Sequence, residues 1–350
     1  MRGRLLYCPE IMICKNHINT GCQIMDIPLI SEIEKKRNEN SILWGSLGKI
    51  KDFTWRYLLL GDVEFRLIYY RDRFRNKILK TGPIECSSDS GFEIHILTCK
   101  RDLLNALWSL KSFYNYNEIN PMLVVHEDGT FDDFCVKIMK NHFRNCRIIQ
   151  FKKANEEMKK WLKGRKFAYE YRFKHFMFHS LKLFDFYEYS NTNSVMSIDS
   201  DLLFFNKSTE ILDHLKNNKS FFMSDYKSSY SFEPEILGKT LGIEVISNLN
   251  SGLIHLPINQ YDPELLENFL KLCHDNNYPH HGWMEQTAYA VLLSKNPELS
   301  HRLSPQHQIS FAPHQQNTIS HHYVYDGSRK NLYIVGLSQL RKANFLKEFS

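Results

Sequence analysis

The chain lacks long apolar runs. Nowhere among its 350 residues do the ~18 consecutive apolar side chains occur that a membrane-spanning helix requires. Residues 1–21 mix charged and polar side chains throughout, which is not the pattern of a secretory signal peptide. The eight cysteines include no Cys-x-x-Cys pair, and the spacing of Cys8, Cys14, His17 and Cys22 matches none of the usual zinc patterns. We therefore expect reduced thiols and a cytoplasmic protein.

Strong charge of either sign is also missing. The formal net charge is +6 and the pI is about 8.7, which is too mild to indicate nucleic-acid binding but suits an anionic ligand or a peripheral membrane contact. The basic clusters at residues 71–80 and 159–166 are typical of solvated helix faces. With 43% hydrophobic and 24% charged residues, the composition is that of a soluble globular protein, with one large α/β domain or two smaller ones.

The first ninety residues form a predicted extension without recognisable chemistry. Ser31 and Glu34 form a capping box that predicts a helix over residues 32–38, and a second helical stretch follows at residues 63–79. Turn-forming residues then gather between Thr81 and Gly91. We expect a mainly helical extension of residues 1–90 and a main domain of residues 91–350.

From residue 92 onward, strands and helices alternate. Strands are predicted at residues 93–98, 121–126, 147–151, 195–198 and 220–224, and helices at residues 103–113, 131–143, 155–187 (with a break near Gly164) and 208–217. This alternation predicts an α/β fold with a mostly parallel, Rossmann-like sheet that is covered by helices on both faces.

Two aspartates interrupt the most apolar part of this region. Residues 195–198, apart from Ser197, and residues 202–205 are apolar, and Asp199, Ser200 and Asp201 lie between them. An unpaired buried carboxylate costs several kcal/mol, so a pair of them at the end of a buried strand indicates a cation as partner. An exposed turn is the alternative, but no Gly or Pro lies nearby. The pattern favours a divalent metal site formed by both aspartates.

The carboxyl ends of parallel strands meet at one edge of a sheet, where ligands bind. This rule brings Thr98, Lys100 and Arg101 to the same edge as the two aspartates, together with His126 and Glu127. Lys100 and Arg101 would then meet an anion near the N-terminus of the next helix. Charges of a solvent-facing loop are an equally good interpretation of these two side chains.

The second half of the chain adds three further segments. Asn250 and Ser251 precede Gly252, which permits close approach of a ligand or simply forms a bulge. A helix is predicted from residue 280 to about residue 294, with an acid-Gln pair in its first turn, where a carboxylate also stabilises the helix dipole. Two histidines, His321 and His322, lie in a strand-like stretch and point to opposite faces. One of them completes the metal site, or both are hydrogen-bonded structural residues.

Together these segments resemble the glycosyltransferases of the GT-A fold, the nucleotide-diphosphosugar transferases, and distantly the family 8 galactosyltransferase-like group. The resemblance implies a GT-A catalytic domain at residues 91–350. It also implies that Asp199 and Asp201 form an Asp-x-Asp motif that holds Mn²⁺ or Mg²⁺ on the diphosphate of the donor. His322 is the third metal ligand by this resemblance, with His321 as second choice.

The resemblance also assigns roles to other residues. It places Asn250, Ser251 and Gly252 near the donor sugar, and the acid-Gln pair, Glu285 and Gln286, at the reaction centre. The remaining predicted donor-binding residues are Thr98, Lys100, Arg101, His126, Glu127, Ser200 and, on the helix before the Asp-x-Asp strand, Lys174 (first choice), Lys182 and Arg172. Residues 326–330 replace the His-Gly-Lys-Pro-Trp ending of many family members.

The function implied is metal-assisted transfer of a sugar from a nucleotide-diphosphate sugar, with UDP-sugar as the family default. The acceptor is a glycan, lipid-linked or other hydroxyl group, as in surface polysaccharide synthesis. Glu285 is the general base if the reaction inverts configuration, and the sequence does not decide between inversion and retention. A sugar-phosphate nucleotidyltransferase is disfavoured because residues 98–102 contain no glycine. A non-catalytic GT-A-like scaffold is the other alternative, and the oligomeric state stays open.

Overall fold

The structure is a computed structural model that describes residues 62–174, 177–277, 282–324 and 326–349. The predicted helix at residues 32–38 and the cysteines Cys8, Cys14 and Cys22 lie outside these ranges. The chain divides into two compact units, residues 1–65 and residues 66–350, and nearly all described residues belong to the second.

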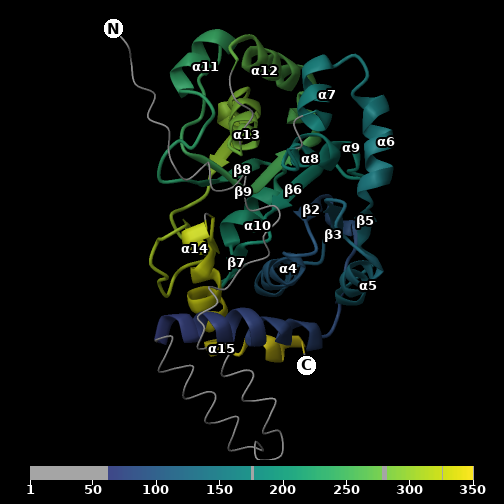
Figure 1. Cartoon of the computed structure of the whole chain (residues 1–350). Coiled ribbons are helices and arrows are strands. Elements are labelled where there is room, and N and C mark those ends of the chain that lie inside the picture. Colours follow the sequence, from purple (N-terminus) through teal and green to yellow (C-terminus); the bar gives the residue numbers. More distant parts are fainter. Residues whose placement is uncertain (1–61, 175–176, 278–281, 325, 350) are drawn as a thin grey trace, which may run out of the picture. The chain divides into compact units, whose positions relative to one another are not determined.

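A seven-stranded sheet forms the centre of this second unit, in the order β10-β8-β9-β6-β2-β3-β5 (Figure 1). Its strands are β2 (Glu93–Thr98), β3 (Met122–Glu127), β5 (Arg147–Ile149), β6 (Ser194–Ile198), β8 (Ser220–Ser224), β9 (Leu249–Pro257) and β10 (Ser300–Arg302). Four of the six strand pairings are parallel, and only β9 runs against its neighbours. The predicted mostly parallel α/β sheet is therefore confirmed.

The apolar strand β6 is buried on both faces, as its sequence predicts. Val195 packs into one hydrophobic cluster, whereas Met196 and Ile198 pack into the other. This separation follows from the two-residue period of a strand. Because β6 is in the middle of the sheet, the aspartates that follow it are held at the edge by a rigid element.

Helices cover both faces of the sheet (Figure 1). The described helices of residues 91–294 are α4 (Leu103–Asn117), α5 (Asp133–His142), α6 (Phe151–Trp161), α7 (Lys166–Phe173), α8 (Ser180–Leu183), α9 (Asp185–Glu188), α10 (Thr209–Lys216), α11 (Pro234–Leu241), α12 (Pro263–Asp275) and α13 (Met284–Ser294). The predicted helical region 155–187 thus contains parts of four helices. Gly164, with φ of 95°, accounts for the expected break, and a second break follows Phe173.

The compact unit begins before the predicted boundary at residue 90. Helical turns η2 (Tyr69–Phe74) and η3 (Arg75–Lys80) pack against α4, and the Phe74 ring stacks on Trp108 with 5.6 Å between ring centroids. After the turn-forming residues, β1 (Ile84–Glu85) pairs with β4 (Phe143–Arg144). These residues are a tight connection inside the unit, although their composition resembles that of a linker.

A smaller sheet, in the order β11-β12-β7, positions the C-terminal histidines. Its strands are β7 (Leu202–Phe204), β11 (His307–Ile309) and β12 (Ser320–His322), and β12 runs antiparallel to β7. In this register His322 is opposite Leu202, the residue after Asp201. The remaining helical elements are η4 (Ser88–Ser90), η5 (Ile258–Gln260), η6 (Pro297–Leu299), α14 (Asp326–Asn331), η7 (Leu332–Leu337), α15 (Ser338–Lys342) and η8 (Phe345–Phe349).

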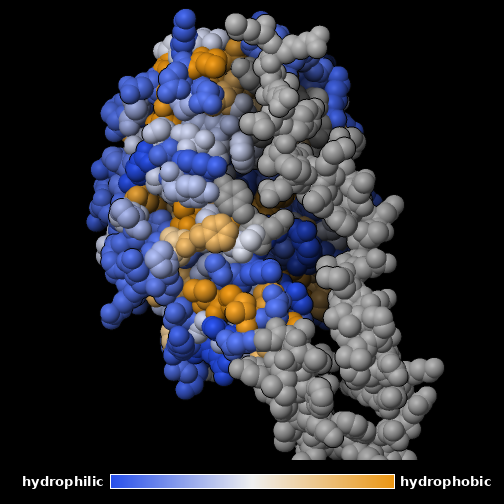
Figure 2. Space-filling model, turned by 60° about the vertical axis from the view of Figure 1, so that its left-hand side comes forward, coloured by the Kyte–Doolittle hydropathy of each residue, from blue (hydrophilic) through white to orange (hydrophobic). Residues whose placement is uncertain are grey.

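The surface of the described residues is largely hydrophilic, with apolar side chains gathered in a few patches on the face drawn in Figure 2. Aromatic side chains that stay exposed include Phe178, Tyr226, Trp283 and Phe311. Among the helices of the described residues, none has the length and apolar character needed to cross a membrane. Within the same residues the cysteines are free thiols.

Candidate active site

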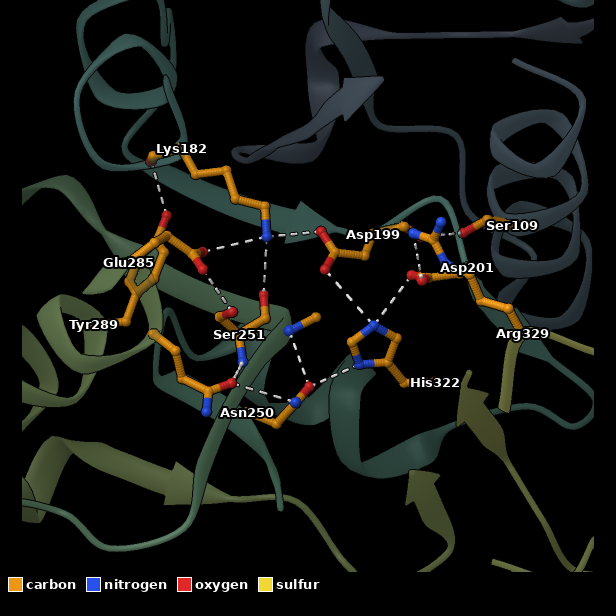
Figure 3. A network of polar contacts seen from close by, with 12 residues as sticks. Ser109, Lys182, Asp199, Asp201, Asn250, Ser251, Glu285, Tyr289, His322 and Arg329 are labelled. Atoms are coloured by element: carbon orange, nitrogen blue, oxygen red, sulfur yellow. Dashed lines mark hydrogen bonds and ion pairs between the residues drawn. The ribbon is translucent and has the colours of Figure 1, made fainter. Parts of the chain in front are cut away.

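The turn between β6 and β7 carries Asp199 and Asp201, and backbone hydrogen bonds fix it on both sides. The Asp199 N–H donates to the carbonyl of Gly252 at 2.9 Å, and the Ser109 hydroxyl donates to the Asp199 carbonyl at 2.8 Å. The Tyr323 N–H donates to the Asp201 carbonyl at 2.9 Å. Residues from α4, β9 and the segment after β12 therefore hold the two carboxylates in place (Figure 3).

Asp199, Asp201 and His322 converge on one point. One ligand atom from each lies within 4.8 Å of the other two. The His322 Nε2 atom is 3.1 Å from Asp201 Oδ1 and 3.7 Å from Asp199 Oδ2. Neighbouring ligand atoms of one Mn²⁺ or Mg²⁺ ion lie about 3 Å apart when each is about 2.1 Å from the metal. The three side chains therefore fit a divalent cation with only small adjustments.

Because Gly252 on β9 has no side chain, the His322 ring can pack directly against the backbone there. A Cβ atom at residue 252 would lie 2.3 Å from both Cε1 and Nδ1 of the His322 ring. The sequence leaves open close approach of a ligand or a bulge at this glycine. The pairing of β8 with β9 shifts register across residues 251–253, which is a bulge, and the group that approaches Gly252 is the imidazole.

The carboxylates of Asp199 and Asp201 favour the protonated form of His322. Burial alone would lower the pKa of His322, but the neighbouring Asp201 and Asp199 carboxylates raise it above the ordinary value. Burial opposes ionisation of Asp201, yet His322 and Arg329 hold the Asp201 pKa below its usual value. The imidazolium proton therefore neutralises part of the negative charge, and a divalent cation would replace that proton.

A buried lysine lies between the cluster of Asp199, Asp201 and His322 and the acid-Gln pair, and it forms ion pairs with both. Lys182 on α8 is 3% exposed, and its Nζ lies 2.7 Å from Asp199 Oδ1 and 3.2 Å from Glu285 Oε1 (Figure 3). Burial would lower the pKa of Lys182, but Asp199 and Glu285 raise it well above the ordinary value, so the ammonium stays charged. The Ser251 hydroxyl donates to Glu285 Oε2 at 2.8 Å.

These residues line a cavity at the carboxyl edge of β6. Lys182, Asp199, Asn250, Glu285 and His322 contribute to its wall. Trp283 also lines it and keeps 43% of its surface exposed. The arrangement offers carboxylate and imidazole ligands for a cation beside a fixed ammonium group, which together suit a polyanionic ligand.

The structure places the predicted cations differently from the sequence. Lys174, the first choice, is exposed at the end of α7 and pairs with Glu170 at 2.7 Å. Arg172 is buried and pairs with Asp185 on α9 through two contacts of 2.9 Å. Of these three cations, Lys182, on the separate helix α8, is the one that lines the cavity.

The other predicted residues at the sheet edge take structural positions. Lys100 is exposed and pairs with Asp132 at 2.6 Å, which fits the solvent-facing alternative. Arg101 is also exposed and pairs with its half-buried neighbour Asp102, at the start of α4, at 3.0 Å. Glu127 accepts hydrogen bonds from the N–H groups of Gly129 and Phe151, both at 2.6 Å, and so stabilises the loop after β3.

Three more predicted donor-binding residues, Thr98, His126 and Ser200, are not among the described residues that line the cavity. Thr98 and His126 are buried at the ends of their strands, and His126 contacts His95 at 3.0 Å. Ser200 is half-buried in the turn between the two aspartates. His321 points away from the aspartates and contacts the Ser310 carbonyl at 3.0 Å, so His322 is the histidine of the cluster.

The sequence reasoning missed two charged residues of the site. Arg329, in the segment that departs from the family ending, places NH2 at 3.5 Å from Asp201 Oδ2. Asp225 follows β8 directly, lines the cavity and is 5% exposed, and burial raises its pKa. Since β8 runs parallel to β6, the rule of the carboxyl edge applies to Asp225 as well.

No family model matches the chain, and no curated protein sequence matches it. Similar solved structures include mouse xyloside xylosyltransferase 1 in its apo form, with 11% identity and a TM-score of 0.47 over 66% of this chain and 97% of that one. The galactosyltransferase LgtC with donor and acceptor sugar analogs has 9% identity and a TM-score of 0.47, over 74% and 96% of the two chains.

A third similar structure is core-mannan synthase A from Aspergillus fumigatus in a Mn/GDP form. It has 10% identity and a TM-score of 0.44, over 62% of this chain and 73% of that one. At such identities a comparison concerns the fold alone. The chemistry of the cavity therefore has to be inferred from its own residues.

Proposed function

We propose that the protein is a metal-dependent glycosyltransferase that uses a nucleoside diphosphate sugar as donor. The convergence of Asp199, Asp201 and His322 at the carboxyl edge of the sheet, beside the buried Lys182, carries this proposal. Three protein ligands leave the remaining positions of a six-coordinate ion open to oxygen atoms of a diphosphate. A donor set of two carboxylates and one imidazole suits Mn²⁺ better than Mg²⁺.

The charges of the cavity support a diphosphate as leaving group. Without an ion, the four carboxylates of Asp199, Asp201, Asp225 and Glu285 outnumber the three cationic groups, Lys182, Arg329 and protonated His322. A bound divalent cation would add positive charge that neutralises the departing diphosphate. Lys182 is held by two carboxylates, so its ammonium group is positioned before the donor binds.

Glu285 serves best as a positioning group in this arrangement. Its Oε1 contacts Lys182 and its Oε2 accepts the Ser251 hydroxyl proton at 2.8 Å. Both oxygens of Glu285 thus have partners within the protein, which fits a positioning role better than the role of general base for an acceptor hydroxyl. The proposed role of Glu285 is to fix Lys182 and the β9 segment against the donor.

The mouth of the cavity suits a carbohydrate acceptor. Trp283 lines the cavity and is 43% exposed, Tyr226 follows the lining residue Asp225 and is 61% exposed, and Phe178 precedes the lining residue His179 and is 47% exposed. An aromatic side chain that lines a concave site and stays partly exposed, as Trp283 does, indicates a binding surface. A sugar ring offers an apolar face to such rings, so we propose a glycan acceptor, as in polysaccharide or lipid-linked glycan synthesis.

A donor screen tests the proposed function. The protein is incubated with UDP-, GDP- and other nucleotide sugars in Mn²⁺, in Mg²⁺ and in chelator, and release of nucleoside diphosphate is measured. We expect metal-dependent release with at least one donor, UDP-sugar being the first choice, and loss of release in Asp201→Asn. A second incubation supplies a nucleoside triphosphate and a sugar 1-phosphate, and release of pyrophosphate there would indicate the nucleotidyltransferase alternative. No release in either incubation would indicate a binding module. A peripheral membrane contact of residues 1–90 stays a prediction.

A further inference from the structure

The side chain of Gln286 has a fixed orientation. Its Nε2 lies 3.0 Å from the carbonyl oxygen of Ser229, which can only accept, so Nε2 must be the donor. Its Oε1 accepts the Ser251 N–H at 3.1 Å and the Asn250 Nδ2–H at 3.3 Å. Gln286 is 7% exposed, so solvent offers little alternative to these partners.

The same chain of hydrogen bonds also fixes the orientation of the Asn250 side chain. Because its Nδ2 donates to Gln286, its Oδ1 faces the other way and accepts the Gly252 N–H at 3.0 Å. The same Oδ1 lies 2.8 Å from Nδ1 of His322 (Figure 3). An amide oxygen can only accept, so Nδ1 of His322 must carry a proton. Backbone groups at Ser229, Ser251 and Gly252 therefore determine the direction of every hydrogen bond up to the imidazole.

We propose that Gln286 is a positioning residue that acts through Asn250 to keep the proton of neutral His322 on Nδ1. Nε2 then has a free lone pair directed at Asp199 and Asp201, the form that a metal ligand requires. This inference rests on the proposed metal site. It assigns Gln286 a role different from the reaction-centre role implied by the family resemblance, because both polar atoms of its side chain are engaged by the protein.

The opposite tautomer is disfavoured by the same contacts. It would set the Nδ1 lone pair against the Asn250 oxygen and direct an N–H at the position of the cation. If the Gln286 acceptor is removed, only the Gly252 N–H and the Asp225 carboxylate still orient the Asn250 amide, so a turned amide with its NH₂ group facing Nδ1 becomes less costly. Either tautomer of His322 then becomes accessible, and metal affinity falls.

The test uses Gln286→Met, with Thr287→Val as its matched control. Thr287 is the next residue on α13, is buried, and makes two hydrogen bonds of 2.8 Å, from the Ser231 N–H and to the Trp283 carbonyl, without contacting Asn250 or His322. Both variants lose buried hydrogen bonds and should have a lower Tm. Gln286→Met should weaken Mn²⁺ binding about 10- to 100-fold in the absence of nucleotide, and Thr287→Val should change it less than about 2-fold.

Two further measurements separate positioning from a general structural effect. In ¹⁵N NMR spectra of the metal-free protein, at a pH where the ring is neutral, His322 should be protonated on Nδ1 in wild type and in Thr287→Val, and should show a second tautomer in Gln286→Met. Asn250→Ala should weaken Mn²⁺ binding at least as much as Gln286→Met. Adding Gln286→Met to Asn250→Ala should have no further effect.

The proposal is overturned if Gln286→Met keeps the wild-type Mn²⁺ affinity and tautomer, or if the two substitutions weaken binding additively. If Gln286→Met does not fold, Asn250→Ala still tests the link nearest to His322. The NMR measurement needs no metal. If wild type fails to bind Mn²⁺, the proposed function fails, while the tautomer result still decides whether Gln286 directs His322.

Discussion

Gly252→Ala is the substitution for which the structure gives the clearest magnitude. The added Cβ would lie 2.3 Å from Cε1 and Nδ1 of His322 and 2.9 Å from Nε2. Non-bonded heavy atoms are normally separated by about 3.5 Å, so the ring has to move by about 1 Å. Metal ligands tolerate deviations of only about 0.2 Å. The displaced imidazole can therefore no longer share an ion with Asp199 and Asp201.

We expect Gly252→Ala to weaken Mn²⁺ binding at least about 100-fold, which corresponds to about 2.7 kcal/mol. Electron paramagnetic resonance of free Mn²⁺ during a titration measures this affinity. Gly238→Ala on α11 is the matched control, because its Cβ would lie 2.7 Å from the Ile243 carbonyl oxygen, outside the lining of the cavity. Both variants should lose stability in thermal unfolding, but only Gly252→Ala should lose the metal. Wild-type Mn²⁺ affinity in folded Gly252→Ala would refute the assignment of His322 as a ligand.

Three further predictions concern charges and the cavity mouth. Lys182→Met leaves Asp199 and Glu285 without their buried cation, so the free energy of unfolding should fall by about 3–5 kcal/mol in denaturant titrations, and an unchanged value would contradict the buried ion pair. Burial lowers the pKa of Lys111 to about 7, so between pH 7 and 10 the unfolded chain binds the extra proton and wild-type stability should rise by up to about 1.4 kcal/mol per pH unit. In Lys111→Met this rise should shrink, and an identical slope would refute the assignment. Trp283→Ala should lower kcat/KM for a glycan acceptor more than it lowers donor hydrolysis, and equal losses would argue against an acceptor role for this ring.

Local patterns were sufficient to predict the most important part of the site. The apolar run before Asp199 predicts a buried strand. Two carboxylates at the end of a buried strand are costly without a cation, so residues 195–201 alone predict both the strand and the pair of candidate metal ligands at its carboxyl end. His322 needed a resemblance to a known family. Its place beside Asp201 depends on the pairing of β12 with β7, which joins segments more than 100 residues apart in the sequence.

Other features depend on long-range packing that a local pattern does not contain. The choice of Lys174 came from the family resemblance, which offered three cations on the helical region before the Asp-x-Asp strand. The break near Gly164 was predicted, but the second break, after Phe173, was not, and it separates Lys174 from Lys182. Turn-forming composition near residue 90 looks the same in a linker and in a tight connection. Only the packing of residues 66–90 against α4 distinguishes the two cases.

The most direct test of the account is calorimetric titration of UDP into the protein with and without Mn²⁺, in wild type and in Asp201→Ala. Asp201 is 12% exposed and contacts both His322 and Arg329, so its removal takes away a ligand and leaves two cationic groups without their partner. The account predicts UDP binding that requires Mn²⁺ in wild type and disappears in Asp201→Ala. Equal UDP binding by both proteins in Mn²⁺, or failure of wild type to bind any nucleoside diphosphate with Mn²⁺ present, would contradict a metal-dependent donor site at these aspartates.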